Sequence, residues 1–159
     1  MKEYVVDVIG KTDDNLAVIL QPVCEDISRR DLLYTGDQLI QIINVVCEIN
    51  IICKLSLRDL RPSNILVQNN GNICIIDFCS VVAMDQVVPY YGTSKFASSR
   101  ILEYLSSNVI TFPIQFGDDY HSLVRLCYVS MISGAYPQLK RLESHNYQIE
   151  TCQRSLAQS

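Results

Sequence analysis

The sequence predicts an α+β domain, mostly helical, that contains two β-hairpins. Two β-branched runs, at residues 4 to 9 and 16 to 20, flank a polar turn and are typical of a hairpin. A second hairpin at residues 65 to 77 is indicated by the Asn-Gly turn between its two apolar strands. Apolar residues recur at helical spacing over residues 37 to 53 and 119 to 132, which predicts two longer helices.

The helix at 37 to 53 is expected to open at Gly36 and Asp37, and the one at 119 to 132 to be capped by Asp118 or Asp119. These two helices are predicted to pack against each other under the second hairpin.

A further short helix is predicted at residues 96 to 105, whereas residues 78 to 94 carry no regular pattern. The chain of 159 residues is long enough for one domain with a core. We therefore expect a single domain over residues 1 to 159. Its parts are an N-terminal hairpin at 1 to 23, a main body at 24 to 137 and a polar tail at 138 to 159.

Composition excludes several classes of protein. A net charge of −4 argues against a nucleic-acid partner bound by bulk electrostatics. The longest apolar stretch, residues 39 to 57, is interrupted by polar residues and predicts a buried helix, so we expect no membrane partner. The N-terminus carries acidic residues where a secretory signal would be apolar. The seven cysteines include no C-x-x-C pair, so we expect buried free thiols and an intracellular, cytoplasmic location.

Candidate functional residues gather in LSLRDLRPSNILV, at residues 55 to 67. Asp59, Arg61 and Asn64 fall in a loop directly before the second hairpin, and Asp77 ends that hairpin. Because a hairpin brings its two ends together, Asn64 and Asp77 are expected to be neighbours. Their amide and carboxylate oxygens suit Mg2+, which also takes phosphate oxygens.

The other two residues have compatible roles. Asp59 could accept or orient a hydroxyl proton, and Arg61 could offset negative charge on a transferred phosphoryl group. The alternative is an ordinary loop that caps the preceding helix and starts the hairpin, since Asp and Asn are common turn formers.

This loop resembles the catalytic and metal-binding loops of the protein kinase superfamily, whose pattern is H-R-D-L-K-P-x-N, then a hairpin and D-F-G. The resemblance implies a C-terminal kinase lobe of serine/threonine type, with ATP and Mg2+ as cofactors and a protein as substrate. It implies that Asp59 is the catalytic base, that Arg61 stands at the lysine position, and that Asn64 and Asp77 bind the metal and nucleotide.

Three other segments carry the resemblance further. The residues GTSKFA, from Gly92, resemble the family's G-T-x-x-Y-M-A substrate segment. The residues DYHSL resemble the opening of its central helix, which implies that Asp119 holds the backbone of the catalytic loop. LAVILQPV resembles the strand before the adenine-binding hinge, which would lie near Gln21 to Val23.

The sequence also departs from the family pattern. It shows no glycine-rich phosphate loop and no V-A-I-K lysine; Lys11 falls in the predicted polar turn. Leu57 replaces the loop histidine, Cys79 replaces the D-F-G glycine, and Ala97-Ser98-Ser99 replaces A-P-E, which lacks the anchoring glutamate.

Three functional alternatives follow. The chain is a truncated active kinase, a catalytically dead pseudokinase that binds partner proteins, or a small-molecule phosphotransferase of the same fold. The N-terminal hairpin would expose an apolar lobe interface through which the chain is expected to self-associate.

Overall fold

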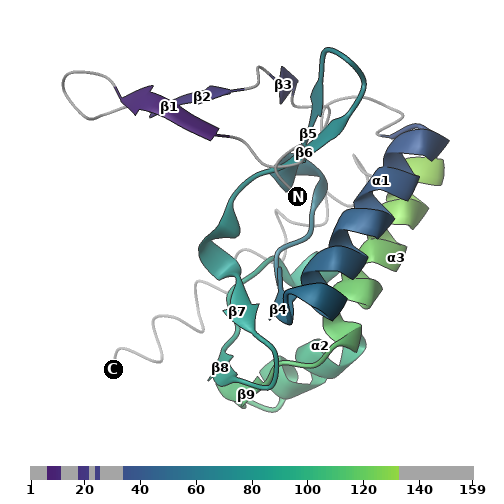
Figure 1. Cartoon of the computed structure of the whole chain (residues 1–159). Helices are drawn as coiled ribbons and strands as arrows, with labels where there is room; N and C mark the ends of the chain where they lie inside the picture. The colour runs from purple at the N-terminus through teal and green to yellow at the C-terminus, as the bar shows by residue number, and fades with distance from the viewer. Residues whose placement is uncertain (1–6, 12–17, 22–23, 26–33, 133–159) are drawn as a thin grey trace, which may run out of the picture.

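The computed structural model is a mixed α/β fold with small antiparallel sheets and, within the described residues, three α-helices (Figure 1). The helices are α1 Gly36–Cys47, α2 Ser99–Ser106 and α3 Gly117–Met131. The structure describes residues 7–11, 18–21, 24–25 and 34–132. The predicted polar tail at 138 to 159 therefore lies outside the described residues.

The first predicted helix is confirmed, including its start at Gly36. α1 continues into a π-helical turn, Glu48–Ile52, so that helical structure covers almost all of residues 37 to 53. Its N-cap is Thr35, whose hydroxyl accepts a 3.3 Å hydrogen bond from the backbone N–H of Gln38. The Gln38 side chain accepts a 3.0 Å bond from the Thr35 N–H in return. This capping box starts the helix before Asp37.

The caps predicted for the third helix were wrong. α3 begins at Gly117 after Phe116, and both Asp118 and Asp119 lie buried in its first turn. Their carboxylates are bonded to other segments, which draws them away from the helix's own N–H groups. α2 likewise begins at Ser99, not at residue 96, because the Ser98 hydroxyl accepts the N–H of Ile101 and caps it there.

Both predicted hairpins are confirmed, with shifted ends. The first pairs β1 Asp7–Lys11 with β2 Val18–Gln21, so Lys11 ends a strand and is not in the turn as predicted. Residues 4 to 6 and 16 to 17 lie outside the described residues, as do positions 22 to 23 of the predicted hinge.

The second hairpin pairs β5 Ile65–Gln68 with β6 Ile73–Ile75, and β3 Cys24–Glu25 adds to the other edge of β5. Gly71 in its turn has φ +87°, a conformation that glycine adopts without a steric cost.

The segment at 78 to 94 is more regular than predicted. It contains β7 Val82–Ala83, which pairs with β4 Leu55–Ser56, and β8 Val87–Pro89, which pairs with β9 Thr111–Pro113. Strands of two or three residues are too short to leave a period in the sequence.

The core lies between the helix pair and the second hairpin, as predicted. α1 and α3 lie side by side, and the β5–β6 hairpin continues the core beyond them (Figure 1). Ile42, Val46, Leu126, Ile65 and Ile73 are all fully buried there. A second, smaller cluster packs around Phe112, under α2 and the β8–β9 pair.

The cysteine prediction holds in part. The six described cysteines are free thiols. Only Cys74 among them is buried, whereas Cys79 is exposed, so the expectation of uniformly buried thiols was wrong. Burial raises the pKa of the Cys24 and Cys127 thiols, which keeps both protonated at neutral pH. Among the described residues, no helix is long and apolar enough to cross a membrane.

We expect Leu126→Ala to lower the free energy of unfolding by about 2–5 kcal/mol, because it leaves a cavity at a fully buried site on α3. His121→Ala, on the exposed side of the same helix, is the control and should change it by less than about 0.5 kcal/mol. Urea denaturation followed by circular dichroism measures both. Equal losses of unfolding free energy in the two variants would contradict the placement of Leu126 in the core.

Candidate functional site

The candidate site is the loop between β4 and β5, residues 57 to 64. Arg58 has φ +65°, and the backbone N–H of Asp59 donates a 2.8 Å hydrogen bond to the carbonyl of Leu57, so the chain reverses sharply there. Pro62–Asn64 then form one 3-10 turn that leads into β5. The proline suits the start of this turn because its φ is already set near the helical value.

The Asp59 carboxylate is the centre of the site. Its Oδ2 accepts a 3.0 Å hydrogen bond from Asn64 Nδ2 and lies 3.1 Å from Arg61 Nε. Its Oδ1 accepts a 2.8 Å hydrogen bond from the backbone N–H of Thr93. The structure therefore brings three of the four predicted site residues together, and adds the segment at Gly92 to them.

Asn64 and Asp77 lie at the open end of the β5–β6 hairpin, directly before β5 and two residues after the end of β6. The Ile76 N–H donates a 2.9 Å hydrogen bond to the Asn64 carbonyl, so Asp77 directly follows the residue paired with Asn64. Asn64 is buried and Asp77 is exposed, with φ +62°. Both hydrogen bonds that Asn64 makes with Asp59 use Nδ2, which leaves its Oδ1 as the atom suited to a cation.

The Asp119 carboxylate binds the backbone at the start of the loop. Its buried carboxylate accepts hydrogen bonds from the backbone N–H groups of Leu57 (2.8 Å) and Arg58 (2.9 Å). It also accepts from the Ser56 hydroxyl (3.1 Å) and from the Asn50 amide (2.8 Å). The expected contact between this aspartate and the loop backbone is confirmed.

Two further loop contacts were not predicted. The Arg58 guanidinium donates to the carbonyl of Pro89 at 2.7 Å, and the Ser80 hydroxyl donates to the carbonyl of Leu57 at 2.6 Å. Burial lowers the pKa of Arg58, while the neighbouring Tyr90 and Asp119 act in the opposite direction. These contacts tie the loop to the segment at 78 to 91.

The segment at 93 to 98 is anchored on α3 by side chains. The Ser122 hydroxyl donates to the Phe96 carbonyl at 2.6 Å, and Arg125 donates to the Lys95 carbonyl at 2.7 Å.

Asp118 anchors the start of α2 on the start of α3. Its carboxylate accepts the Ser98 hydroxyl at 2.6 Å and forms an ion pair with Arg100. Asp118 and Arg100 therefore connect the start of α3 with α2. No local pattern indicates this pair, because its members belong to different helices.

Chemically, the site combines an ion-paired carboxylate, an amide oxygen and a second, exposed carboxylate. Within the described residues, no three His, Cys, Asp or Glu side chains form a cluster that could hold a metal ion. A site of one carboxylate and one amide is of a different kind, suited to Mg2+ that retains water and binds phosphate. No family model matches the chain, and no curated protein matches it either.

We expect Gly92→Ala to separate Thr93 from Asp59. A Cβ at Gly92 would lie 2.5 Å from the Arg58 carbonyl oxygen, so the backbone of one segment must shift. Amide hydrogen exchange should then lose protection at Thr93, while Ile76, which is bonded to Asn64, keeps it. Unchanged protection at Thr93 would show that this close approach does not hold the two segments together.

Proposed function

We propose that this chain carries the catalytic and metal-binding loops of a protein-kinase-like phosphotransferase, within a C-terminal kinase-like lobe. The reaction is transfer of a phosphoryl group from ATP to a serine or threonine hydroxyl of a protein, inside the cell. The observation that carries the proposal is the Asp59 network. The Asp59 carboxylate contacts Arg61, Asn64 and the Thr93 backbone. These residues follow Asp59 along the chain in the same order as the motifs to which they belong.

In this proposal Asp59 orients the attacking hydroxyl and accepts its proton. Arg61, whose side chain is about one-third exposed, stands beside that carboxylate and offsets negative charge on the phosphoryl group. Thr93 belongs to the segment that would present the substrate hydroxyl, since its N–H is bonded to the same carboxylate. The hydrogen bonds to Asp119 hold the loop backbone in place. The Asp59 carboxylate is therefore positioned before the reaction begins, which avoids the entropy cost of ordering it.

Asn64 and Asp77 would hold Mg2+, through Asn64 Oδ1 and the exposed Asp77 carboxylate. The donor set fits, because both groups supply hard oxygen ligands and Asn64 turns its nitrogen toward Asp59. When bound, Mg2+ would neutralise charge on the nucleotide phosphates.

The proposal is tested by nucleotide binding. We expect Mg2+-dependent ATP binding to the chain, measured by isothermal titration calorimetry, to be lost in Asp77→Ala. The matched control is Asp85→Ala, since Asp85 is also an exposed aspartate with positive φ (66°) but lies in the turn before β8. ATP binding that survives Asp77→Ala, or that falls equally in Asp85→Ala, would contradict the metal site.

A second function is favoured by one observation: both Asp59 oxygens already accept from groups of the chain itself. A carboxylate held in this way also suits a structural role in a pseudokinase that binds partner proteins. Nucleotide binding without phosphoryl transfer would favour this second function.

A further inference from the structure

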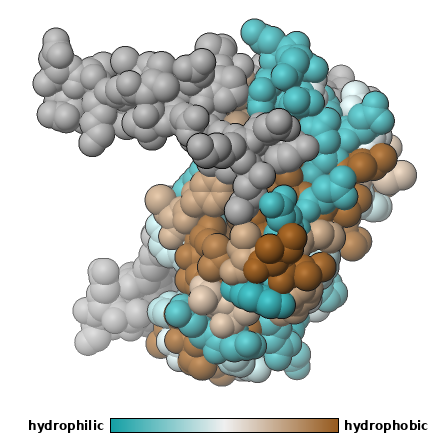
Figure 2. Space-filling model, in the orientation of Figure 1, coloured by the Kyte–Doolittle hydropathy of each residue, from teal (hydrophilic) through white to brown (hydrophobic). Residues whose placement is uncertain are grey.

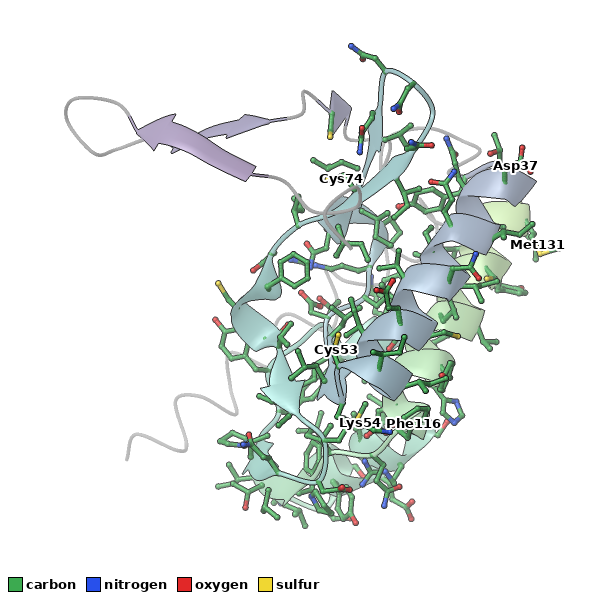
Figure 3. The ribbon with its side chains drawn as sticks, in the orientation of Figure 1. Asp37, Cys53, Lys54, Cys74, Phe116 and Met131 are labelled. Atoms are coloured by element: carbon green, nitrogen blue, oxygen red, sulfur yellow. The ribbon has the colours of Figure 1, made fainter. Side chains whose placement is uncertain are left out.

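Side chains at the start of α1, and directly before it, hold the β5–β6 hairpin, which carries Asn64 and Asp77 at its open end. Figure 3 places Asp37, in the first turn of α1, at the same end of the helix pair as this hairpin, whereas Lys54 and Phe116 lie at the other end. The contacts between the start of α1 and the hairpin therefore decide where the two proposed metal ligands lie.

The tip of the hairpin is held by two glutamines of α1. Figure 2 shows hydrophilic residues over this tip, so apolar burial does not fix it. The Gln38 Nε2 donates a 3.1 Å hydrogen bond to the Gly71 carbonyl, and the Gln41 Oε1 accepts a 3.0 Å bond from the Ile73 N–H. Gln38 is also the partner of Thr35 in the capping box, so its position follows from the start of the helix.

The base of the hairpin is held by Tyr34, which lies directly before the N-cap of α1. Tyr34 is part of the main core and is 3% exposed. Its hydroxyl donates to two carbonyl oxygens, that of Pro62 at 3.2 Å and that of Ile65 at 3.1 Å. These carbonyls lie on either side of Asn64 along the chain, so one buried hydroxyl spans the backbone of a proposed metal ligand.

The Tyr34 hydroxyl supplies a donor beyond the end of a strand. The described part of β3 pairs with β5 at Val67 and Gln68 and does not reach Ile65. A buried carbonyl that loses its donor costs free energy, because it has also lost its contact with water. The hydroxyl therefore fixes the backbone where the loop at residues 57 to 64 enters β5.

Asn64 is consequently held from two directions. Its Nδ2 donates 3.0 Å hydrogen bonds to the Asp59 carbonyl and to Asp59 Oδ2, which fixes the side chain. Its backbone is fixed by the Ile76 N–H, at 2.9 Å from the Asn64 carbonyl, and by the Tyr34 hydroxyl on the neighbouring carbonyls. Groups that orient a metal ligand in this way typically change metal affinity by about 10-fold to 100-fold when they are removed.

We propose that Tyr34 is a positioning residue for Asn64, which it holds through its hydroxyl and the carbonyls of Pro62 and Ile65. This inference rests on the proposed function, since it requires that Asn64 and Asp77 hold Mg2+. Tyr34 is buried and acts on the metal through Asn64. A tyrosine with a purely structural role would stabilise the chain, but its hydroxyl would not change the metal affinity of a chain that is already folded.

The test compares the full wild-type chain with Tyr34→Phe, which keeps the ring in the core and removes the hydroxyl. Circular dichroism should show an unchanged fold. The Kd for Mg2+–ATP, measured by isothermal titration calorimetry, should rise about 10-fold or more. Tyr120→Phe is the matched control, because it removes a hydroxyl that lies on α3, 3.8 Å from the Cys47 sulfur, and it should leave the Kd unchanged.

Amide hydrogen exchange supplies a second measurement that depends on neither bound metal nor activity. In Tyr34→Phe, exchange should become about 5-fold faster at Ile65 and Ile76, whose N–H groups bond to the backbone carbonyls at the loop exit. The N–H of Leu39, which is bonded within the start of α1, should keep its exchange rate.

The outcomes separate this inference from the proposed function. A wild-type chain that binds no Mg2+–ATP would overturn both. If the wild-type chain binds, an unchanged Kd in Tyr34→Phe, or an equal rise in Tyr120→Phe, would overturn the role of Tyr34 and leave the metal site standing. Equal acceleration of exchange at Leu39, as in a variant that no longer folds, would show that the hydroxyl stabilises the whole chain, and would overturn that role as well.

Discussion

The Asp119→Ala variant is expected to lose about 4 kcal/mol or more of its free energy of unfolding. Asp119 is 1% exposed, and its carboxylate accepts hydrogen bonds from four donors, one on Asn50 and three on residues 56 to 58. Each buried donor left without an acceptor costs about 1–3 kcal/mol. Since a domain of this size is stable by only about 5–15 kcal/mol, the variant should be largely unfolded or melt at a much lower temperature.

Thermal and urea denaturation followed by circular dichroism measure this loss. Asp37→Ala is the control: Asp37 is an exposed acid in the first turn of α1, where its charge contributes at most about 1 kcal/mol. Asp119→Asn keeps one acceptor oxygen in the same place and should fall between the two. A loss below about 1 kcal/mol in Asp119→Ala would show that other contacts hold the loop backbone.

The second large effect concerns chemistry and depends on the proposed function. Phosphoryl transfer by the chain is expected to be weak, because the sequence shows no V-A-I-K lysine to align ATP. Asp59→Asn should reduce it by a further factor of about 100 to 10,000, the usual cost of removing one catalytic base. The fold should persist, since the asparagine side chain has the same shape and keeps one acceptor oxygen, although the Asp59 side chain is largely buried, with 12% of it exposed.

Transfer of radiolabelled phosphate from ATP measures turnover, and circular dichroism checks the fold of each variant. Asp85→Asn, at the exposed aspartate away from the site, is the matched control and should leave turnover unchanged. Robust transfer that is insensitive to Asp59→Asn would contradict the mechanism. Transfer that vanishes with Asp59→Asn would instead exclude the pseudokinase alternative.

The sequence predicted that Asp59, Arg61 and Asn64 lie together better than it predicted what surrounds them. Asp59, Arg61 and Asn64 are close in the chain, so one loop brings them together. The tie from Asp59 to Thr93 joins residues far apart in the sequence and depends on the close approach of Gly92 to Arg58. No periodic pattern or residue spacing in the sequence predicts this close approach of Gly92 to Arg58.

By itself, the sequence determined the two long helices and both hairpins. Their signals are local: apolar residues at helical spacing, and an Asn-Gly turn between β5 and β6. Only the tertiary structure decided the short strand pairs β4–β7 and β8–β9, whose partners are distant and whose lengths are too small to show a period. It also decided that the carboxylates of Asp118 and Asp119 accept hydrogen bonds from other segments and do not cap α3. Both aspartates are buried, and buried donors from the neighbouring segments need an acceptor. The same holds for Ile40 and Ile43, whose helical pattern is plain in the sequence while their exposure depends on which side of α1 meets the core.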